Sequence, residues 1–177
     1  MPSEASGCKP LDYAAQRASE LEAWLPHLYG NRFASVLALK GESGPSEQSG
    51  NPPFFGMDGE ALENALATLG WGSNAWCGIA LELPEKGIIG SSELRMLVEI
   101  IDPRALLALD RQAIDALQLS FGIELLPSIP IPGQITWLLG RALVYVEGFE
   151  AALISGEEEA KRRVWRELRT LKPSMSY

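Results

Sequence analysis

The sequence predicts one α/β domain in which helices cover both faces of a central, mostly parallel, four-stranded sheet. Apolar segments of strand length alternate with amphipathic helical segments along the whole chain. The strand segments are almost continuously apolar, which is typical of parallel strands that are buried on both faces. The chain has 177 residues, the length of a single domain. We therefore expect one domain over residues 1–177, with residues 1–10 disordered.

The first half of the chain alternates helix and strand twice. Its predicted elements are a helix over residues 11–29, a strand at 34–39, a loop at 41–57, a helix at 59–69 and a strand at 75–81. Leucine and alanine recur at helical spacing in both helices, whereas the strands are short apolar runs. Gly30 and Gly70 are predicted to end the helices, and Asp58 is the predicted N-cap of the second.

The second half continues the alternation. Its predicted elements are a loop at 84–90, a helix at 92–101, a strand at 104–109, a helix after Asp110, an apolar piece at 123–126, a proline-rich loop at 127–133, a strand at 142–146 and a helix at 156–171. The predicted N-terminal caps are Ser91 or Ser92, Asp110, and a capping box of Ser155 and Glu158. The alternation of strands and helices over the whole length predicts a three-layer α/β domain with a parallel sheet.

The charge balance argues against strong autonomous binding of duplex DNA. The net charge is −8, whereas proteins that hold a duplex carry a basic face. A local basic patch can coexist with an acidic total, and the candidates are Lys161, Arg162, Arg163, Arg166, Arg169 and Lys172. Glutamates at 157–159 partly neutralise this stripe. We expect Trp71, Trp137 and Trp165 to be core or interface anchors rather than ligand platforms.

Cysteine and histidine usage limits the kinds of site that the chain can build. Two cysteines, Cys8 and Cys77, and one histidine, His27, are too few for a disulfide framework or a zinc site of several histidines. We therefore predict no metal and no cofactor. No apolar run approaches the roughly 20 residues that cross a bilayer, and the first residues lack a secretory pattern. The prediction is a cytoplasmic protein without membrane contact.

The run Gly-Glu-Ser-Gly-Pro-Ser-Glu at residues 41–47 is the strongest indication of a functional site. It lies between a predicted strand and a predicted helix, where an open α/β sheet binds its ligand because backbone amides converge there. Glu42 and Glu47 are the candidate catalytic residues, since a carboxylate can position water or stabilise positive charge. The alternative is that Glu42 bonds loop amides and Glu47 is solvated.

Several segments, taken together, resemble the uracil-DNA glycosylase superfamily, especially its bacterial iron–sulphur branch. The segments are Gly41-Glu42-Ser43-Gly44-Pro45, Asn51-Pro52-Pro53-Phe54-Phe55-Gly56, the strand at 101–109 with Asp110 in place of a glycine, and 151–154 with 164–168. The resemblance covers residues 34–172 and implies the fold of that family. It also implies a ligand pocket made by Gly41, Glu42, Ser43, Gly44, Phe54, Ile79 and Phe149. In the family the phenylalanine that corresponds to Phe54 stacks on the base. The alternative is that Phe54 is a core residue that anchors the loop.

The departures from the family pattern concern the residues that carry its chemistry. Phe149 stands where the family has a histidine that stabilises charge on the departing uracil. Ile79 falls at or near the asparagine that reads the base edge, and isoleucine can neither donate nor accept a hydrogen bond. The cysteines of the iron–sulphur cluster are missing, with Cys8 at most a remnant. The resemblance thus implies a catalytically degenerate member of the family.

Three hypotheses about function follow, and the sequence leaves them open. The first is a non-enzymatic binding or accessory protein whose partner is a replication or repair protein. The second is an active, divergent glycosylase that uses Glu42 or Glu47. The third is a module that binds a small anion or a nucleotide at the glycine-rich loop.

Overall fold

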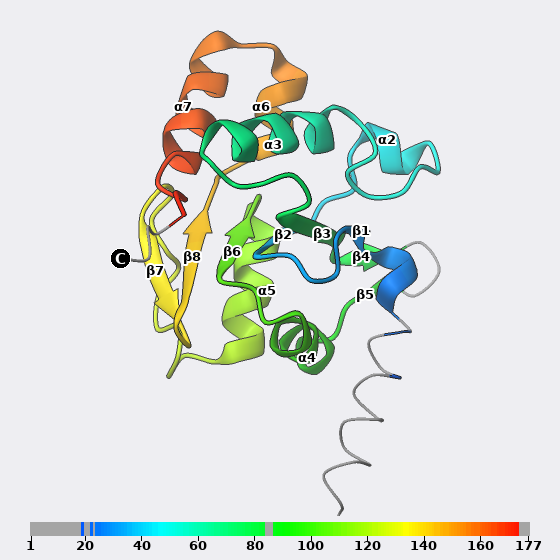
Figure 1. Cartoon of the computed structure of the whole chain (residues 1–177), viewed down its shortest axis with the longest axis vertical. Coiled ribbons are helices and arrows are strands. Elements are labelled where there is room, and N and C mark those ends of the chain that lie inside the picture. Colours follow the sequence, from blue (N-terminus) through cyan, green and yellow to red (C-terminus); the bar gives the residue numbers. More distant parts are fainter. Residues whose placement is uncertain (1–18, 20–21, 23, 84–86, 174–177) are drawn as a thin grey trace, which may run out of the picture.

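The computed structural model describes residues 19, 22, 24–83 and 87–173 (Figure 1). The expected disorder of residues 1–10, Cys8 and most of the predicted helix at 11–29 lie outside the described residues. The prediction is wrong for the last residues of that helix, because Leu25–His27 form a 3-10 turn, η1, and Tyr29–Gly30 form strand β1. Gly30 was predicted to cap this helix. It has a positive φ of +85°, as such a cap requires, but it pairs with Cys77 in the sheet.

The central sheet is mostly parallel and has six strands rather than the predicted four. The four predicted strands form its parallel middle: β2 (Val36–Lys40), β3 (Trp76–Ala80), β6 (Ala105–Ala108) and β8 (Arg141–Tyr145). The edges are β1 and β7 (Ile135–Leu138), both antiparallel to their neighbours, in the order β1-β3-β2-β6-β8-β7. A tight turn at Leu139-Gly140, both at positive φ, joins β7 to β8.

Helices cover both faces of this sheet, as predicted. On one face lie α4 (Ser91–Ile101) and α5 (Arg111–Phe121), and on the other lie α3 (Met57–Thr68), α6 (Phe149–Ser155) and α7 (Glu158–Leu168) (Figure 1). Alternate strand residues supply the two cores, so Leu37 and Leu39 face α4 and α5 while Val36 and Ala38 face the other layer. A one-turn helix, α2 (Pro45–Gln48), lies inside the predicted loop, and β4 (Glu82–Leu83) pairs with β5 (Gly87–Ile88).

The helix starts were predicted correctly only at Asp110, which caps α5 by accepting a 2.8 Å hydrogen bond from the amide of Ala113. Asp58 is not a cap, because α3 begins at Met57 and the Asp58 side chain is turned into the interior. Gly90 precedes α4 in place of the serines. Ser155 ends the unpredicted α6 instead of opening α7, so the predicted capping box does not form.

Candidate functional site

The carboxyl ends of three parallel strands meet at a small cavity. Lys40 is the last residue of β2, Asp110 follows β6, and Glu150 follows β8. The cavity has a volume of about 40 Å³ and is lined by Lys40, Glu42, Asp58, Leu109, Asp110, Gly148, Phe149, Glu150 and Ala151. It lies at the edge of the sheet where open α/β proteins bind ligands, as the sequence predicted.

Lys40 is buried at the centre of three carboxylates. Its Nζ donates to Glu47 Oε1, to Asp58 Oδ2 at 2.7 Å and to Glu150 Oε2 at 3.5 Å, and only 3% of its side chain is exposed. Burial lowers the pKa of Lys40, but the hydrogen bonds that it donates to Asp58 and Glu47 more than offset this, so the pKa is raised above its ordinary value. The ammonium of Lys40 is therefore retained among these three carboxyl groups.

Glu47 holds the glycine-rich loop closed. Its Oε1 accepts from the amide of Phe54 at 3.1 Å, and its Oε2 accepts from the amide of Gly44 at 2.9 Å. Burial alone would raise the pKa of Glu47, but the ammonium of Lys40 outweighs burial and lowers it. The expectation that Glu47 is solvated is therefore wrong. Both of its oxygens are bound within the protein.

Glu42, the other candidate catalytic residue, has an exposed side chain at the mouth of the cavity. Its part in the loop is played by its backbone. The amides of Gly41 and Glu42 donate to Oδ2 of Asp110 at 2.7 and 3.1 Å, while Oδ1 of the same carboxylate caps α5. The loop amides that were expected to face a ligand are thus bound by the carboxylates of the chain itself.

Replacing Asp110 with alanine should lower the free energy of unfolding by about 2 kcal/mol, the upper end of the range for a lost N-cap. The variant loses the cap of α5 and leaves the amides of Gly41 and Glu42 without their acceptor. Urea unfolding measures the change. The control is Asp115→Ala, which removes an exposed pair with Arg111 on the same helix and should cost less than about 0.5 kcal/mol. Equal losses in the two variants would contradict this account.

Phe54 is a core residue in this structure. It is 1% exposed, and its ring packs edge-on against Trp76 with centroids 5.5 Å apart. The Lys40 ammonium lies 5.0 Å from the centroid of the same ring. Gly78 is required on the facing strand, because a Cβ there would overlap the Phe54 ring. Of the two alternatives for Phe54, this packing supports the anchor of the loop.

The remaining predicted pocket residues are only partly brought together. Phe149 is buried at the start of α6 and lines the cavity. Gly44 lies so close to Glu150 that a Cβ there would overlap the carboxylate. Ser43 lies in the loop but does not line the cavity. Ile79 does not join the site, because it points to the opposite face of the sheet and packs with α4 and α5. Its neighbour Gly78 is the residue of β3 that faces Phe54.

Lys40, Asp58 and Glu150 were not identified from the sequence as site residues. One signal was present: Lys40 ends an apolar strand of which every residue is buried, and lysine is rarely buried without a partner. Oδ1 of Asp58 is buried and has no hydrogen-bond partner among the described residues. Within the same part of the chain, no group of three or more histidine, cysteine, aspartate or glutamate residues is arranged to hold a metal ion.

The contribution of Glu150 to the free energy of unfolding should change with pH in the opposite direction from that of Glu47. Burial, and then repulsion by Asp58 and Glu47, raises the pKa of Glu150 despite the attraction of Lys40. A raised pKa means that its contribution to stability is complete below the unfolded pKa and is lost as the pH rises through the folded pKa. Glu150→Gln should therefore raise the free energy of unfolding at pH 7, by up to about 1 kcal/mol. The gain should vanish below about pH 4.

Urea midpoints of the wild type and of Glu150→Gln at the two pH values test this prediction. Glu60→Gln on α3 is the control, since Glu60 is exposed and its substitution should change little at either pH. A Glu150→Gln variant that is less stable than the wild type at pH 7 would show that the contact with Lys40 outweighs burial and repulsion.

No family model matches the sequence, and no curated protein is significantly similar to it. None of the helices in the described residues is both long enough and apolar enough to span a bilayer.

Proposed function

We propose that this chain has a uracil-DNA-glycosylase-like fold and acts as a non-enzymatic binding or accessory protein in DNA replication or repair. The observation that carries the proposal is that backbone amides of the glycine-rich loop already donate hydrogen bonds to carboxylates of the same chain. The amides of Gly41 and Glu42 are bound by Asp110, and those of Gly44 and Phe54 are bound by Glu47. These four amides are already paired, so they offer no hydrogen bonds to a base or to a developing negative charge.

The size of the cavity supports the loss of base excision. An enzyme that removes a base encloses the flipped base in a fitted pocket and stacks it on apolar or aromatic side chains. Here the cavity of about 40 Å³ has room for about three water molecules, far fewer atoms than a nucleobase contains. Phe54, for which the sequence left a platform and a core residue open, is packed against Trp76 and is not available for stacking.

The same bonds weigh against a module for small anions. A phosphate at this loop would have to displace carboxylates from the amides that they bind. The positive charge of Lys40 is already surrounded by three carboxylates, so it adds no attraction for an anion.

A second candidate function is an active, divergent glycosylase, and one feature favours it. Asp58 has a buried oxygen without a partner among the described residues, and Glu150, across the same cavity, has a raised pKa. Two carboxylates in different environments are the arrangement that general acid–base catalysis uses. In this version Asp58 and Glu150 take the catalytic roles that were predicted for Glu42 and Glu47.

Base release from single-stranded and duplex DNA that contains uracil separates the two candidates. We expect no release by the wild-type protein. Release that is lost in Asp58→Asn or Glu150→Gln and retained in Glu60→Gln would overturn the proposal in favour of the second candidate. The accessory role is tested by proximity labelling in the host cell, which should enrich replication or repair proteins. Enrichment of unrelated proteins alone would overturn that role.

A further inference from the structure

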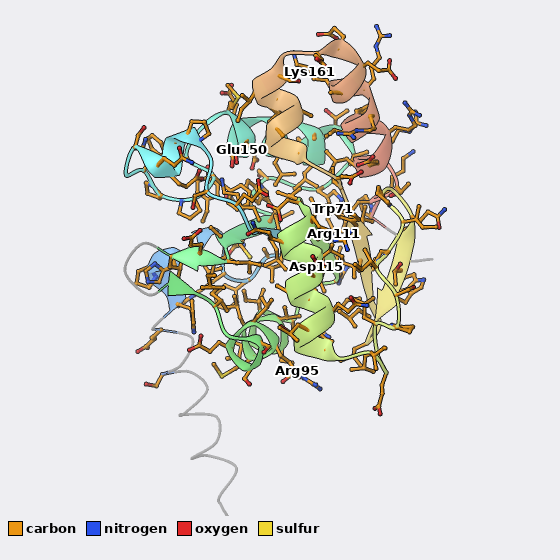
Figure 2. The ribbon with its side chains drawn as sticks, turned by 180° about the vertical axis from the view of Figure 1, so that it is seen from behind. Trp71, Arg95, Arg111, Asp115, Glu150 and Lys161 are labelled. Carbon is orange, nitrogen blue, oxygen red and sulfur yellow. The ribbon has the colours of Figure 1, made fainter. Side chains whose placement is uncertain are left out.

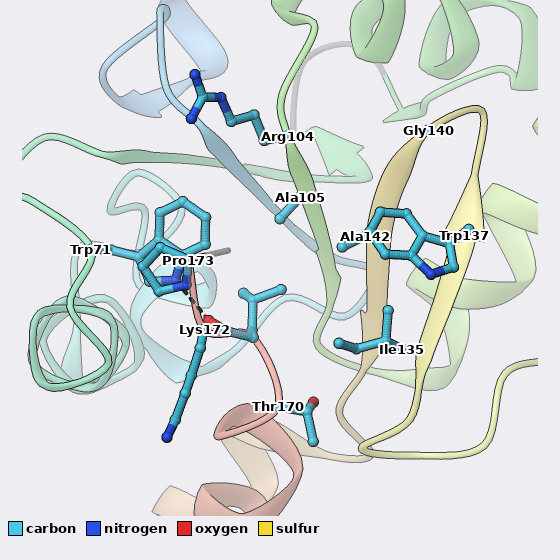
Figure 3. Close-up of a pocket in the computed structure, with 11 residues that line it drawn as sticks. Trp71, Arg104, Ala105, Ile135, Trp137, Gly140, Ala142, Thr170, Lys172 and Pro173 are labelled. Carbon is cyan, nitrogen blue, oxygen red and sulfur yellow. Dashed lines mark hydrogen bonds between the residues drawn. The ribbon is translucent and has the colours of Figure 1, made fainter. Parts of the chain in front are cut away.

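A second hollow lies at the opposite end of the sheet, on the face that α3 and α7 cover. It has a volume of about 290 Å³ and opens between β7, the start of β8 and the segment that follows α7 (Figure 3). Its floor is made of small residues, Ala105 on β6 and Ala142 on β8, with Gly140 at one end. Because these side chains are small, they leave a shallow space where the sheet surface would otherwise be filled.

Two tryptophans form opposite walls of this groove. Trp137 projects from the edge strand β7, and 65% of it is exposed. The ring therefore presents a large apolar surface to water. Trp71 faces it across Ala105 and Ala142 (Figure 3), and its Nε1 donates to the backbone oxygen of Leu171 at 2.7 Å. That hydrogen bond fixes the Trp71 ring in place, so the groove has one anchored and one exposed aromatic wall. Of the two roles expected for Trp137, that of a core anchor is therefore wrong.

Basic residues lie in the groove and beside it, although the whole chain carries a net charge of −8. Arg104 and Lys172 line it directly. Lys172 and Thr170 also line an adjoining hollow whose other basic residues are Arg163, Arg166 and Arg169 of α7 and its end. Among the described residues, no ion pair is formed by Arg104, Arg169 or Lys172.

The acidic residues nearby neutralise this surface only in part. The shortest approach of Arg163 to Glu167 and of Arg166 to Glu159 is 3.9 Å in each case. Glu167 is buried, and its carboxylate accepts from the amide of Glu147 at 3.0 Å. An exposed basic strip thus runs from the arginines of α7 to the tryptophan-walled groove.

We propose that this groove binds single-stranded nucleic acid, with bases against Trp137 and Trp71 and phosphates along the arginines. Proteins that bind single strands combine a basic groove with aromatic side chains on which bases stack. A single strand fits better than a duplex, because only unpaired bases expose a face to the tryptophans. The proposal uses no residue of the small cavity at the other end of the sheet, so it does not depend on the proposed function.

Fluorescence anisotropy with labelled oligothymidylate and oligouridylate tests the proposal on the full chain. We expect binding at low salt that weakens as salt rises. Trp137→Ala should weaken it by about tenfold or more, which corresponds to the loss of one stacked base. The matched control is Phe55→Ala, which removes a comparably exposed aromatic ring from the loop at the other end of the sheet. It should leave the affinity unchanged.

The charge contribution is tested with Arg166→Ala combined with Arg169→Ala. This double variant should weaken binding and make the salt dependence less steep, by about 0.7 in the logarithmic slope for each phosphate that is no longer neutralised. Arg95→Ala combined with Arg111→Ala, on the helices that cover the opposite face, is the control (Figure 2). Equal effects of the two pairs would mean that charge acts without regard to the groove, and would overturn the proposal.

Competition distinguishes the ligands that this surface could take. A difference between oligothymidylate and oligouridylate identifies DNA or RNA as the preferred strand, and either supports the proposal. Displacement by polyglutamate as effective as by an unlabelled oligonucleotide would overturn it and indicate an acidic protein segment. Duplex DNA that binds as tightly as the single strand, with no effect of Trp137→Ala, would overturn it as well.

Discussion

Replacing Lys40 with methionine is expected to lower the free energy of unfolding by about 3–5 kcal/mol at pH 7, the cost of removing one partner from a buried ion pair. The three carboxylates around Lys40 lose their counter-charge, and Glu47 and Asp58 are almost completely buried. Methionine keeps most of the apolar stem, so the effect measures the charge. Urea or guanidinium unfolding gives the value.

The pH dependence separates this effect from simple misfit of the new side chain. The pKa of Glu47 is lowered in the folded protein, so its contribution is present above the unfolded pKa and is lost as the pH falls through the folded pKa. The deficit of Lys40→Met should therefore shrink as the solution becomes acidic. The control is Arg111→Met, which breaks an exposed pair and should cost less than about 0.5 kcal/mol. A deficit for Lys40→Met that does not change with pH would point to misfit rather than charge.

Phe54→Ala should also destabilise the protein by about 3–5 kcal/mol, since it leaves a cavity against Trp76 and Gly78. Alanine has the same difficulty as phenylalanine at the positive φ of 61°, so the backbone contribution should change little. The neighbouring Phe55 is 64% exposed and provides a matched control. Phe55→Ala should change the free energy of unfolding by less than about 0.5 kcal/mol. Similar small losses in both variants would show that Phe54 is a surface platform and not a core residue.

The parallel strands could be predicted because each is a short apolar run between helical segments, a pattern that burial on both faces requires. The edge strands β1 and β7 could not. β1 has two residues, and β7 is half-exposed with no regular alternation of its own. Both owe their structure to pairing with a neighbour that lies elsewhere in the sequence. The sheet was therefore predicted with two strands too few.

The location of the site could be predicted, but not its composition. A glycine-rich segment after a buried strand indicated the loop, whereas the cluster joins Lys40, Asp58 and Glu150 from three distant parts of the chain. Such a cluster depends on tertiary packing and leaves no local pattern in the sequence. Ile79 was misplaced for a related reason, since a shift of one residue along a strand moves a side chain to the other face of the sheet.

The two ends of the sheet differ in sign. The carboxylates of Glu42, Asp58, Asp110 and Glu150 gather at the carboxyl ends of the strands, while Arg104 and Lys172 lie at the amino ends. Such a separation gives the two cavities local fields of opposite sign. A charged ligand that approaches is drawn toward the cavity of opposite charge, so the place of encounter depends on these local fields as well as on the net charge.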